Sequence, residues 1–342
     1  MPNIAINGFG RIGRNVFKAG LGKEGFNVVA VNDLTDTKTL AHLLSHDTVF
    51  HAFDHPVKSD EKHIIVDGKK IAVYAEKDPA MLPWKKLKID VVLECTGRFT
   101  NLEAASAHIK AGAKRVVISA PAKGGVPTYV IGVNEKGAGA TDLVINNASC
   151  TTNCIAPVAA VIHETFGIKK ALMSTVHAYT AEQNLVDGPP PGLKSGDLRR
   201  ARAAAENIIP TTTGAAIATT EVIPDLKDRF DGMAIRVPII DGSLTDFTFL
   251  LKKKTTVEGI NAAFKKAAAS PRFKGILIAS EEPLVSSDII GTSASAIVDL
   301  GLTKVIDGDF VKVIAWYDNE WGYSHRLAEM ALLVAKNLAK EK

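Results

Sequence analysis

The sequence predicts an α/β protein in which a doubly wound parallel sheet is followed by an α+β domain with a mostly antiparallel or mixed sheet. Short apolar runs alternate with helical patterns in the first part, which is typical of Rossmann-type βαβ units. Further along, the strands become longer and alternate apolar with polar residues. A chain of 342 residues also exceeds what one hydrophobic core usually contains, so we expect two domains.

Short apolar runs in the first part predict parallel strands buried on both faces: Ile4–Ile6, Val28–Val31, Val91–Leu93 and Val116–Ile118. Helical patterns follow the first and third of these, over Arg11–Leu21 and Asn101–Ala111. The run Leu143–Ile145 predicts another strand, and the apolar spacing after it predicts a helix over Thr151–Thr165. We therefore expect the first domain to cover residues 1–149.

The second part of the chain has a different pattern, with longer expected strands and fewer helices between them. The expected strands are Ala171–Val176, Phe230–Pro238, Ser243–Leu250, Ile276–Ala279 and Val311–Tyr317, and the expected helices are Ala215–Val222, Val257–Ala269 and Ser324–Ala339. We place the second domain at residues 150–319 and include in it a loop over residues 179–203, which is rich in proline and glycine. The helical segment 320–342 is expected to pack back onto the first domain.

The composition excludes several classes of protein. Hydrophobic residues make up 46% of the chain and charged residues 23%, as in globular domains, and no apolar run is long enough to span a membrane. Three cysteines do not make a disulfide framework, and no secretory leader pattern is visible, so a cytoplasmic protein is expected. A net charge of +4 suits small anionic ligands but is too weak to indicate nucleic acid as the main partner.

A glycine motif after the first strand predicts a dinucleotide site. Gly8, Gly10 and Gly13 form the pattern GxGxxG at a strand-to-helix turn, where glycines permit the turn, the approach of a pyrophosphate and close helix packing. Asp33 ends the second strand, about 20 residues beyond the motif, where a carboxylate accepts the ribose hydroxyls of the adenosine half. Because a carboxylate repels a 2′-phosphate, we expect NAD as the cofactor and not NADP. The alternative is a purely structural glycine turn beside a surface aspartate.

Cys150 is the strongest candidate for a nucleophile. It stands where a strand is expected to turn into a helix, and the N–H groups of a helix start favour a thiolate. The alternative is a buried core cysteine, which is the interpretation we favour for Cys95 and Cys154. His177, at the end of the expected strand Ala171–Val176, is the candidate base for Cys150. The sequence does not show whether the two side chains meet.

Anion-binding residues follow in the second domain. Arg199–Arg202 contains three arginines, and Thr211–Gly214 leads into an expected helix whose N–H groups could hold phosphate. Arg236 lies in an apolar strand, where a charged residue requires a partner or faces a site. The alternative for these arginines is a structural ion pair. Histidines between residues 42 and 63 have irregular spacing and no cysteine neighbours, so we expect no metal site.

Five blocks of residues, in one order along nearly the whole chain, closely resemble the phosphorylating glyceraldehyde-3-phosphate dehydrogenase family. They are Ile6–Arg14, Ala148–Cys154, Leu198–Ala205, Ile209–Ala216 and Trp316–Ser324. This resemblance implies an NAD-dependent oxidative phosphorylation of D-glyceraldehyde 3-phosphate to 1,3-bisphosphoglycerate, in glycolysis or gluconeogenesis. The implied reaction passes through a thiohemiacetal and an acyl-thioester on the cysteine. It also implies a homotetramer whose partners are the small-molecule substrates, glyceraldehyde 3-phosphate and inorganic phosphate.

The resemblance implies a role for each matching residue. Cys150 and His177 match the nucleophile and its base. The residues that match phosphate and substrate contacts are Ser149, Thr151, Thr180, Arg200, Thr213, Gly214 and Arg236. Those that match cofactor contacts are Gly8, Gly10, Arg11, Ile12, Gly13, Asp33, Lys77, Thr96, Ser119, Asn319 and Tyr323. Of these, Asn319 matches the residue that holds the nicotinamide carboxamide and so selects the ring face that receives hydride.

The chain departs from the family pattern in three places. Lys77 replaces a frequent arginine, the stretch Val49–Phe53 lacks a His-Gly pair, and the loop Asp187–Asp197 is longer, with Gly188-Pro189 where a Leu-Pro pair is common. Two other functions remain open. One is a related enzyme that oxidises erythrose 4-phosphate and hydrolyses the thioester. The other is a non-catalytic nucleotide-binding or RNA-binding protein that uses the dinucleotide groove.

Overall fold

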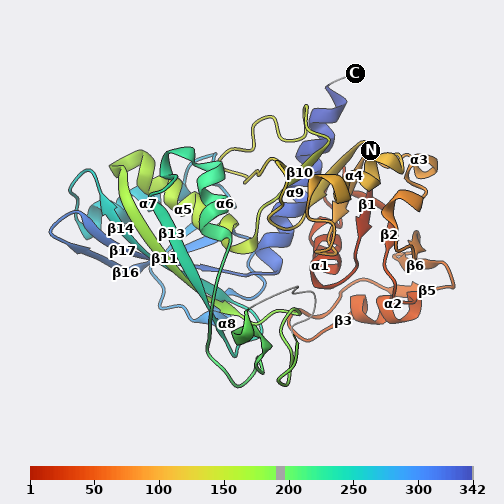
Figure 1. The fold of residues 1–342 in the computed structure, drawn as a ribbon, viewed down its shortest axis with the longest axis horizontal. Coiled ribbons are helices and arrows are strands. Elements are labelled where there is room, and N and C mark those ends of the chain that lie inside the picture. Colours follow the sequence, from red (N-terminus) through yellow and green to blue (C-terminus); the bar gives the residue numbers. More distant parts are fainter. Residues whose placement is uncertain (190–196, 341–342) are drawn as a thin grey trace. The chain divides into compact units, whose positions relative to one another are not determined.

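The computed structural model describes residues 1–189 and 197–340 of the chain. The chain divides into two compact units (Figure 1). Unit 1 comprises residues 1–129, 135–149 and 324–342, and unit 2 comprises residues 130–134 and 150–323. Part of the expected loop 179–203 and the end of the expected segment 320–342 lie outside the described residues.

Unit 1 is built on an eight-stranded sheet with the order β10-β9-β8-β1-β2-β7-β6-β5. Its strands are β1 (Asn3–Asn7), β2 (Asn27–Asn32), β5 (Val57–Ser59), β6 (His63–Val66), β7 (Lys69–Tyr74), β8 (Val91–Glu94), β9 (Arg115–Ile118) and β10 (Val144–Asn146). The pairs from β10 to β7 are parallel, as the sequence predicts for a doubly wound sheet. The edge formed by β7, β6 and β5 is antiparallel, and the sequence analysis did not predict it.

The helices of unit 1 connect these strands, and two of them begin at side-chain caps. They are α1 (Arg11–Gly20), α2 (Thr37–Ser45), α3 (Trp84–Leu87) and α4 (Leu102–Lys110), together with most of α9 (Trp321–Ala339). Asp36 caps α2 and Asn101 caps α4 by accepting a main-chain N–H of the first turn. Helix α1 differs, because its N-cap residue Gly10 offers no side chain and its first turn carries no acidic residue. Its N-terminus is therefore suited to an external anion. A separate two-stranded sheet joins β3 (His46–Asp47) and β4 (His51–Ala52).

Unit 2 is built on a seven-stranded mixed sheet with the order β12-β13-β11-β14-β17-β16-β15. Its strands are β11 (Ile168–Ala178), β12 (Ile209–Thr211), β13 (Phe230–Val237), β14 (Ser243–Leu251), β15 (Leu277–Ser280), β16 (Ala296–Ile306) and β17 (Phe310–Tyr317). Most neighbouring pairs are antiparallel, whereas β11 with β13 and β15 with β16 are parallel. The mostly antiparallel, mixed sheet expected from the sequence is confirmed.

The helices of unit 2 are α5 (Cys150–Phe166), α6 (Ala215–Val222), α7 (Val257–Ala268) and α8 (Ser286–Ile289). One face of the sheet is covered by α5, α6 and α7, whereas on the other face α8 packs on one end of β17 and part of the sheet is left uncovered by the described residues. Helix α5 is buried along most of its length and packs on β11, β14 and β17, while α6 packs on β13 and α7 on β15 and β16 (Figure 1). Every second residue of β14 therefore points into this core. No helix of the described residues is long and apolar enough to cross a membrane.

Candidate active site

Cys150 is the first residue of α5, and the chain enters this helix through a sharp turn. Ala148, two residues earlier, has a φ of +55°, which is the left-handed region that residues other than glycine rarely adopt. Strain of this kind is found most often where a side chain is held for a function. The Cys150 thiol is only partly buried, in contrast to Cys154 one turn further on, which has no exposed surface.

His177 lies next to the end of β11 and faces Cys150. The distance from Cys150 Sγ to His177 Nε2 is 3.5 Å. His177 Nδ1 lies 2.7 Å from the carbonyl oxygen of Ala178, which can only accept a hydrogen bond. Arg236 Nη1, which can only donate, also lies 3.2 Å from Nδ1. With the Nδ1 proton on the shorter contact to the Ala178 oxygen, the lone pair of Nε2 faces the thiol. This is the tautomer that a base for Cys150 requires.

The electrostatic setting disfavours the charged form of each side chain in this pair. Burial raises the pKa of the Cys150 thiol to about 11, although the charge of Arg236 acts in the opposite direction. Burial, helped by the charge of Arg236, lowers the pKa of His177 to about 3. Desolvation thus opposes the thiolate that a helix start favours.

Arginine side chains gather beside the pair around one carboxylate. Arg236 Nη1 donates to the carbonyl oxygen of Ala178 at 3.0 Å and to Thr180 Oγ1 at 3.2 Å. Glu182 Oε1 accepts from Arg236 Nη2 at 3.1 Å and from Arg200 Nη1 at 2.7 Å. Both guanidinium groups are largely buried. Asp197 Oδ2 also lies 3.8 Å from Arg200 Nε, so two carboxylates face the two guanidinium groups, and a ligand phosphate would compete with them for the arginines.

Thr213 and Gly214 stand at the start of α6, close to this cluster. Gly214 is the N-cap residue and offers no side chain, while Thr213 Oγ1 accepts from the N–H of Ala215 at 3.2 Å. Arg200 reaches the preceding residue, because its Nη2 donates to the Thr212 carbonyl oxygen at 2.9 Å. The structure therefore brings the arginine cluster and the start of α6 together.

The hydroxyl of Thr151 lies 4.0 Å from Cys150 Sγ and is bonded to a buried tyrosine. Its Oγ1 lies 2.9 Å from the hydroxyl of Tyr317, which is also bonded to Thr175 Oγ1 at 2.8 Å. The Tyr317 ring meets the His177 ring edge-on, with centroids 5.9 Å apart. Thr151 is thus already bonded through its hydroxyl to one neighbour, and this hydroxyl keeps further capacity for a hydrogen bond. Ser149 belongs to unit 1 and is not placed relative to the others.

The two residues expected to contact the nicotinamide belong to unit 2. Asn319 is almost fully buried, and its Oδ1 accepts a hydrogen bond from Ser243 Oγ at 2.6 Å. Tyr323, in the first turn of α9, is also buried.

The glycine motif and Asp33 line a cavity of about 280 Å³ in unit 1. Other residues lining it are Asn7, Asn32, Leu34, Glu76, Lys77, Cys95, Thr96, Arg98 and Phe99. Gly8 has a φ of +89°, and a Cβ added there would lie 2.8 Å from the N atom of Thr96. A Cβ at Gly10 would meet nothing within 4 Å, so space remains beside the main chain at the start of α1. These observations fit a dinucleotide whose pyrophosphate approaches the helix start.

Asp33 is positioned by the turn it faces. One carboxylate oxygen accepts from the Phe9 N–H at 2.7 Å and the other from the Thr35 N–H at 3.0 Å. Each oxygen keeps a second lone pair, which is what two ribose hydroxyls require.

The remaining residues of unit 1 that were expected to contact the cofactor have mostly structural partners. The Arg11 guanidinium pairs with Asp47 at 2.6 Å, so this residue and Ile12 would meet a cofactor through their main chain at the start of α1. Thr96 donates both its main-chain and its side-chain hydrogen to Glu94. Ser119 follows β9, where its N–H donates to the Glu94 carbonyl oxygen at 3.0 Å. Lys77 lines the wall of the cavity beside the glycine motif.

Three residues of the site were not singled out from the sequence. Glu182 links the two arginines, Tyr317 links Thr151 to β11, and Ser243 holds Asn319. Tyr317 lies within a block that matches the family, but nothing in the pattern predicts its partners. Glu182 and Ser243 carry no local signal, because their contacts are with residues distant in sequence.

Comparisons with known proteins agree with this arrangement. Residues 2–102 match the family model described as glyceraldehyde 3-phosphate dehydrogenase, NAD binding domain, and residues 149–319 match the model of the C-terminal domain. The glyceraldehyde-3-phosphate dehydrogenase of Geobacillus stearothermophilus is 54% identical over 333 residues, which cover 97% of this chain and 98% of that protein. The chain belongs to the glyceraldehyde-3-phosphate dehydrogenase family.

Other members of the glyceraldehyde-3-phosphate dehydrogenase family are similar over the same extent. Glyceraldehyde-3-phosphate dehydrogenase 1 of Bacillus cereus is 53% identical, with 97% of this chain and 98% of that protein covered. The enzyme of Streptomyces coelicolor is also 53% identical, with 98% and 99% covered. The expectations of an NAD-dependent oxidoreductase, of the family and of its two-part α/β fold are thereby confirmed.

Proposed function

We propose that this chain catalyses the NAD-dependent oxidative phosphorylation of D-glyceraldehyde 3-phosphate to 1,3-bisphosphoglycerate. The observation that carries the proposal is the 3.5 Å approach of Cys150 Sγ to the unprotonated Nε2 of His177, beside two arginines that share one carboxylate. A thiol with a base is suited to attack an aldehyde, and the arginines are suited to the phosphate groups of the substrates.

The proposed reaction begins when His177 takes the proton of Cys150 as the sulfur bonds to the aldehyde carbon. The protonated Nε2 then donates its proton to the oxygen of the thiohemiacetal, and it takes this proton back as the hydride leaves. NAD, when bound, accepts the hydride that leaves this carbon. The carbon is thereby oxidised by two electrons to an acyl-thioester on Cys150. Inorganic phosphate attacks the thioester carbonyl, the acyl phosphate departs, and the sulfur recovers a proton.

Each set of site residues has a proposed task. Thr180 and Arg200 hold the substrate's own phosphate, and Arg236 is shared with the site of the attacking phosphate. Ser149, Thr151, Thr213 and Gly214 complete the site of the attacking phosphate. The start of α6 and the cluster around Glu182 support this assignment. Glu182 would have to be displaced or outcompeted when a phosphate binds, since it already occupies both arginines.

The cofactor contacts are likewise proposed residue by residue. Gly8, Gly10, Arg11, Ile12 and Gly13 would hold the pyrophosphate at the start of α1, and Asp33 the adenosine ribose. Lys77, Thr96 and Ser119 would contribute from the same unit. Asn319 and Tyr323 of unit 2 would hold the nicotinamide. The cavity at the glycine motif and the capless start of α1 support the first group.

One assay tests the proposed function. Purified protein is supplied with glyceraldehyde 3-phosphate, with and without inorganic phosphate, and with NAD or NADP, while NADH or NADPH is followed by absorbance. We expect sustained turnover only with NAD and phosphate together. Sustained turnover without phosphate, or a better rate with erythrose 4-phosphate, would overturn the proposal.

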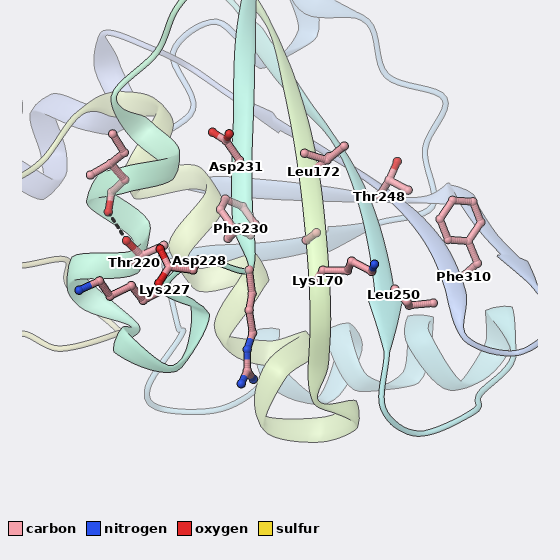
Figure 2. Close-up of a pocket in the computed structure, with 13 residues that line it drawn as sticks. Lys170, Leu172, Thr220, Lys227, Asp228, Phe230, Asp231, Thr248, Leu250 and Phe310 are labelled. Carbon is pink, nitrogen blue, oxygen red and sulfur yellow. Dashed lines mark hydrogen bonds between the residues drawn. The ribbon is translucent and has the colours of Figure 1, made fainter.

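We also propose that the protein is a homotetramer, because unit 2 exposes many apolar side chains. On the uncovered part of its sheet, Leu172 (65% exposed) and Phe310 (47% exposed) line a groove of about 820 Å³ with Leu250 and Thr248 (Figure 2). Four further apolar side chains of this unit are exposed: Leu185, Val186, Leu198 and Ile208. Exposed apolar side chains of this kind are typical of surfaces that contact other subunits.

We propose a cytoplasmic location for the protein. The support is chemical, because the cysteines Cys95, Cys150 and Cys154 are all unpaired, and a reactive thiol persists best in a reducing compartment. Fractionation of the source cells, with NADH formation as the readout, tests this. Recovery of the activity mainly outside the cytoplasmic fraction would contradict it.

A further inference from the structure

Ser243 occupies a buried position between the catalytic strand and the residue assigned to the nicotinamide. It is the first residue of β14 and has 1% of its surface exposed. The β14–β17 register places it opposite Tyr317, two residues before Asn319. On its other side lies Ala178, which directly follows His177 in β11. Ser243 therefore touches both segments that meet at the reacting centre.

The directions of its two hydrogen bonds follow from the groups involved. The N–H of Ala178 can only donate, and it donates to Ser243 Oγ at 3.1 Å. The hydroxyl then has its single proton left to donate, and the neighbour at 2.6 Å is the side-chain amide of Asn319. An amide nitrogen cannot accept this proton, so the oxygen Oδ1 must face Ser243. Among the described residues, no hydrogen bond engages the Nδ2 of Asn319.

The main chain of Asn319 is fixed as well. The carboxylate of the preceding residue, Asp318, accepts from the N–H of Gly291 at 2.8 Å, of Glu320 at 2.8 Å and of Trp321 at 2.5 Å. Asn319 itself is 4% exposed, so its side chain has little freedom to rotate. With the main chain held by Asp318, the remaining degree of freedom is the flip of the amide, and Ser243 is the group that sets it.

We propose that Ser243 is a positioning residue that orients the amide of Asn319 so that its Nδ2 donates to the carbonyl oxygen of the nicotinamide carboxamide. This rests on the proposed function, because it is the NAD site of that reaction which Ser243 completes. A flipped amide would present an oxygen to the carboxamide oxygen and repel it. The same hydroxyl also accepts the N–H of Ala178. Ser243 therefore holds Asn319 in a fixed position relative to Ala178 and to the adjacent base, His177. The proposal concerns the nicotinamide half of the cofactor alone.

The test compares two ligands that differ only in that half. Ser243→Ala removes the hydroxyl, and the affinities for NAD and for ADP-ribose, which lacks the nicotinamide, are measured by titration calorimetry. We expect NAD to bind about fivefold to tenfold more weakly, as for the loss of one hydrogen bond, and ADP-ribose to bind unchanged. The matched control is Thr245→Val, which removes a buried hydroxyl two residues along the same strand that forms no hydrogen bond with Ala178 or Asn319 in the described part of the chain. It should leave both affinities unchanged.

A double-mutant cycle keeps the proposal testable if Ser243→Ala folds poorly. Asn319→Ala should reproduce the selective loss of NAD affinity, and the double variant should lose no more than Asn319→Ala alone. Hydride transfer from aldehyde deuterated at C1 gives a second readout, because a freed carboxamide should lower the selectivity for one ring face. Equal loss of NAD and ADP-ribose affinity, unchanged NAD affinity in either single variant, or additive losses would each overturn the proposal. If the wild-type protein forms no NADH from glyceraldehyde 3-phosphate, it is the proposed function that fails.

Discussion

Cys150 and His177 show how two residues of ordinary type become a reactive pair. Desolvation disfavours the charged form of each side chain, because it raises the pKa of the thiol and lowers that of the imidazole. The pair is nonetheless ready for proton transfer, since Ala178 fixes the imidazole tautomer with Nε2 facing sulfur. The charge of Arg236 is the largest effect that lowers the pKa of the Cys150 thiol. A phosphate bound to Arg236 would offset part of this charge and so weaken its effect on that pKa.

Replacement of Cys150 by serine tests the nucleophile. We expect Cys150→Ser to lower kcat by about a thousandfold or more, because a hydroxyl at this position is a weaker nucleophile and a poorer leaving group. NAD affinity should be retained. NADH formation and NAD titration provide the two measurements, and Cys154→Ala, a buried thiol one helical turn away, is the control. Near wild-type turnover of Cys150→Ser would show that Cys150 is not the nucleophile.

Asp33 is expected to select NAD by its charge. Asp33→Ala removes the carboxylate that would face a 2′-phosphate, so the ratio of kcat/KM for NADP to that for NAD should rise by about tenfold or more. Because Asp33 also accepts the Phe9 N–H, affinity for NAD should fall as well. Steady-state kinetics with both cofactors measure this. An unchanged ratio would refute the role given to Asp33.

Most of the proposed site residues lie at the ends of helices and strands. Cys150 begins α5, His177 lies next to the end of β11, Gly214 caps α6 and Asp33 follows β2. Side chains at these ends can face a ligand, while the elements behind them are held by the core. The turn between β13 and β14 follows the same rule, because it ends at Ser243 and contains the buried carboxylate Asp241.

Asp241 should make stability depend on pH. Burial and the charges of Asp318 and Glu320 raise its pKa to about 9, far above the 3.8 of an unperturbed carboxyl. The folded protein therefore holds a proton that the unfolded chain releases at intermediate pH, and the free energy of unfolding falls as pH rises between about 4 and 9. Asp241→Asn should raise that free energy at pH 8 by at least about 1 kcal/mol and flatten the slope. Urea unfolding at pH 5 and pH 8 measures both effects.

The control for this substitution is Asp231→Asn, which removes an exposed carboxylate from β13. It should leave the slope unchanged. Parallel pH curves for the wild-type protein and Asp241→Asn would show that Asp241 is ionised in the folded state at neutral pH, contrary to the prediction.

Part of the unit 2 sheet, on the face opposite to α5, is left uncovered by the described residues. There Leu172 pairs with Thr248, and Leu250 pairs with Phe310 (Figure 2). Three of these four side chains are apolar and at least partly exposed to solvent, and the charged residues Lys170 and Asp231 line the same groove. A second copy of the chain is the occupant we propose for it.

A charge on this face should break the assembly. Leu172→Glu places a carboxylate in the proposed interface, where an unpaired buried charge costs about 3 kcal/mol or more. We expect the tetramer to dissociate into smaller species while each subunit stays folded, as measured by sedimentation equilibrium and circular dichroism. Leu102→Glu, at an exposed position of α4 in unit 1, is the control. A wild-type monomer, or an unchanged mass for Leu172→Glu, would contradict the proposed assembly.

The elements with periodic apolar patterns were predictable, and those without were not. The strands β1, β2, β8 and β9 and the helix α6 were expected within a residue or two of their ends, because buried parallel strands and apolar helix faces leave strong local patterns. The antiparallel strands β5 to β7 lie at a sheet edge, where exposed lysines and a serine mask the strand pattern.

The sequence by itself determined the family and the dinucleotide motif, and it singled out Cys150 and His177 as the candidate nucleophile and base. These are carried by residues that are adjacent in the chain, such as Gly8 to Gly13 and Ala148 to Cys154. Only the tertiary structure decided that Nε2 of His177 faces the thiol, that Glu182 joins two arginines, and that Ser243 sets the amide of Asn319. Each of those contacts joins segments that the sheet of unit 2 brings together, and a hydrogen bond depends on distances and directions that no local pattern encodes.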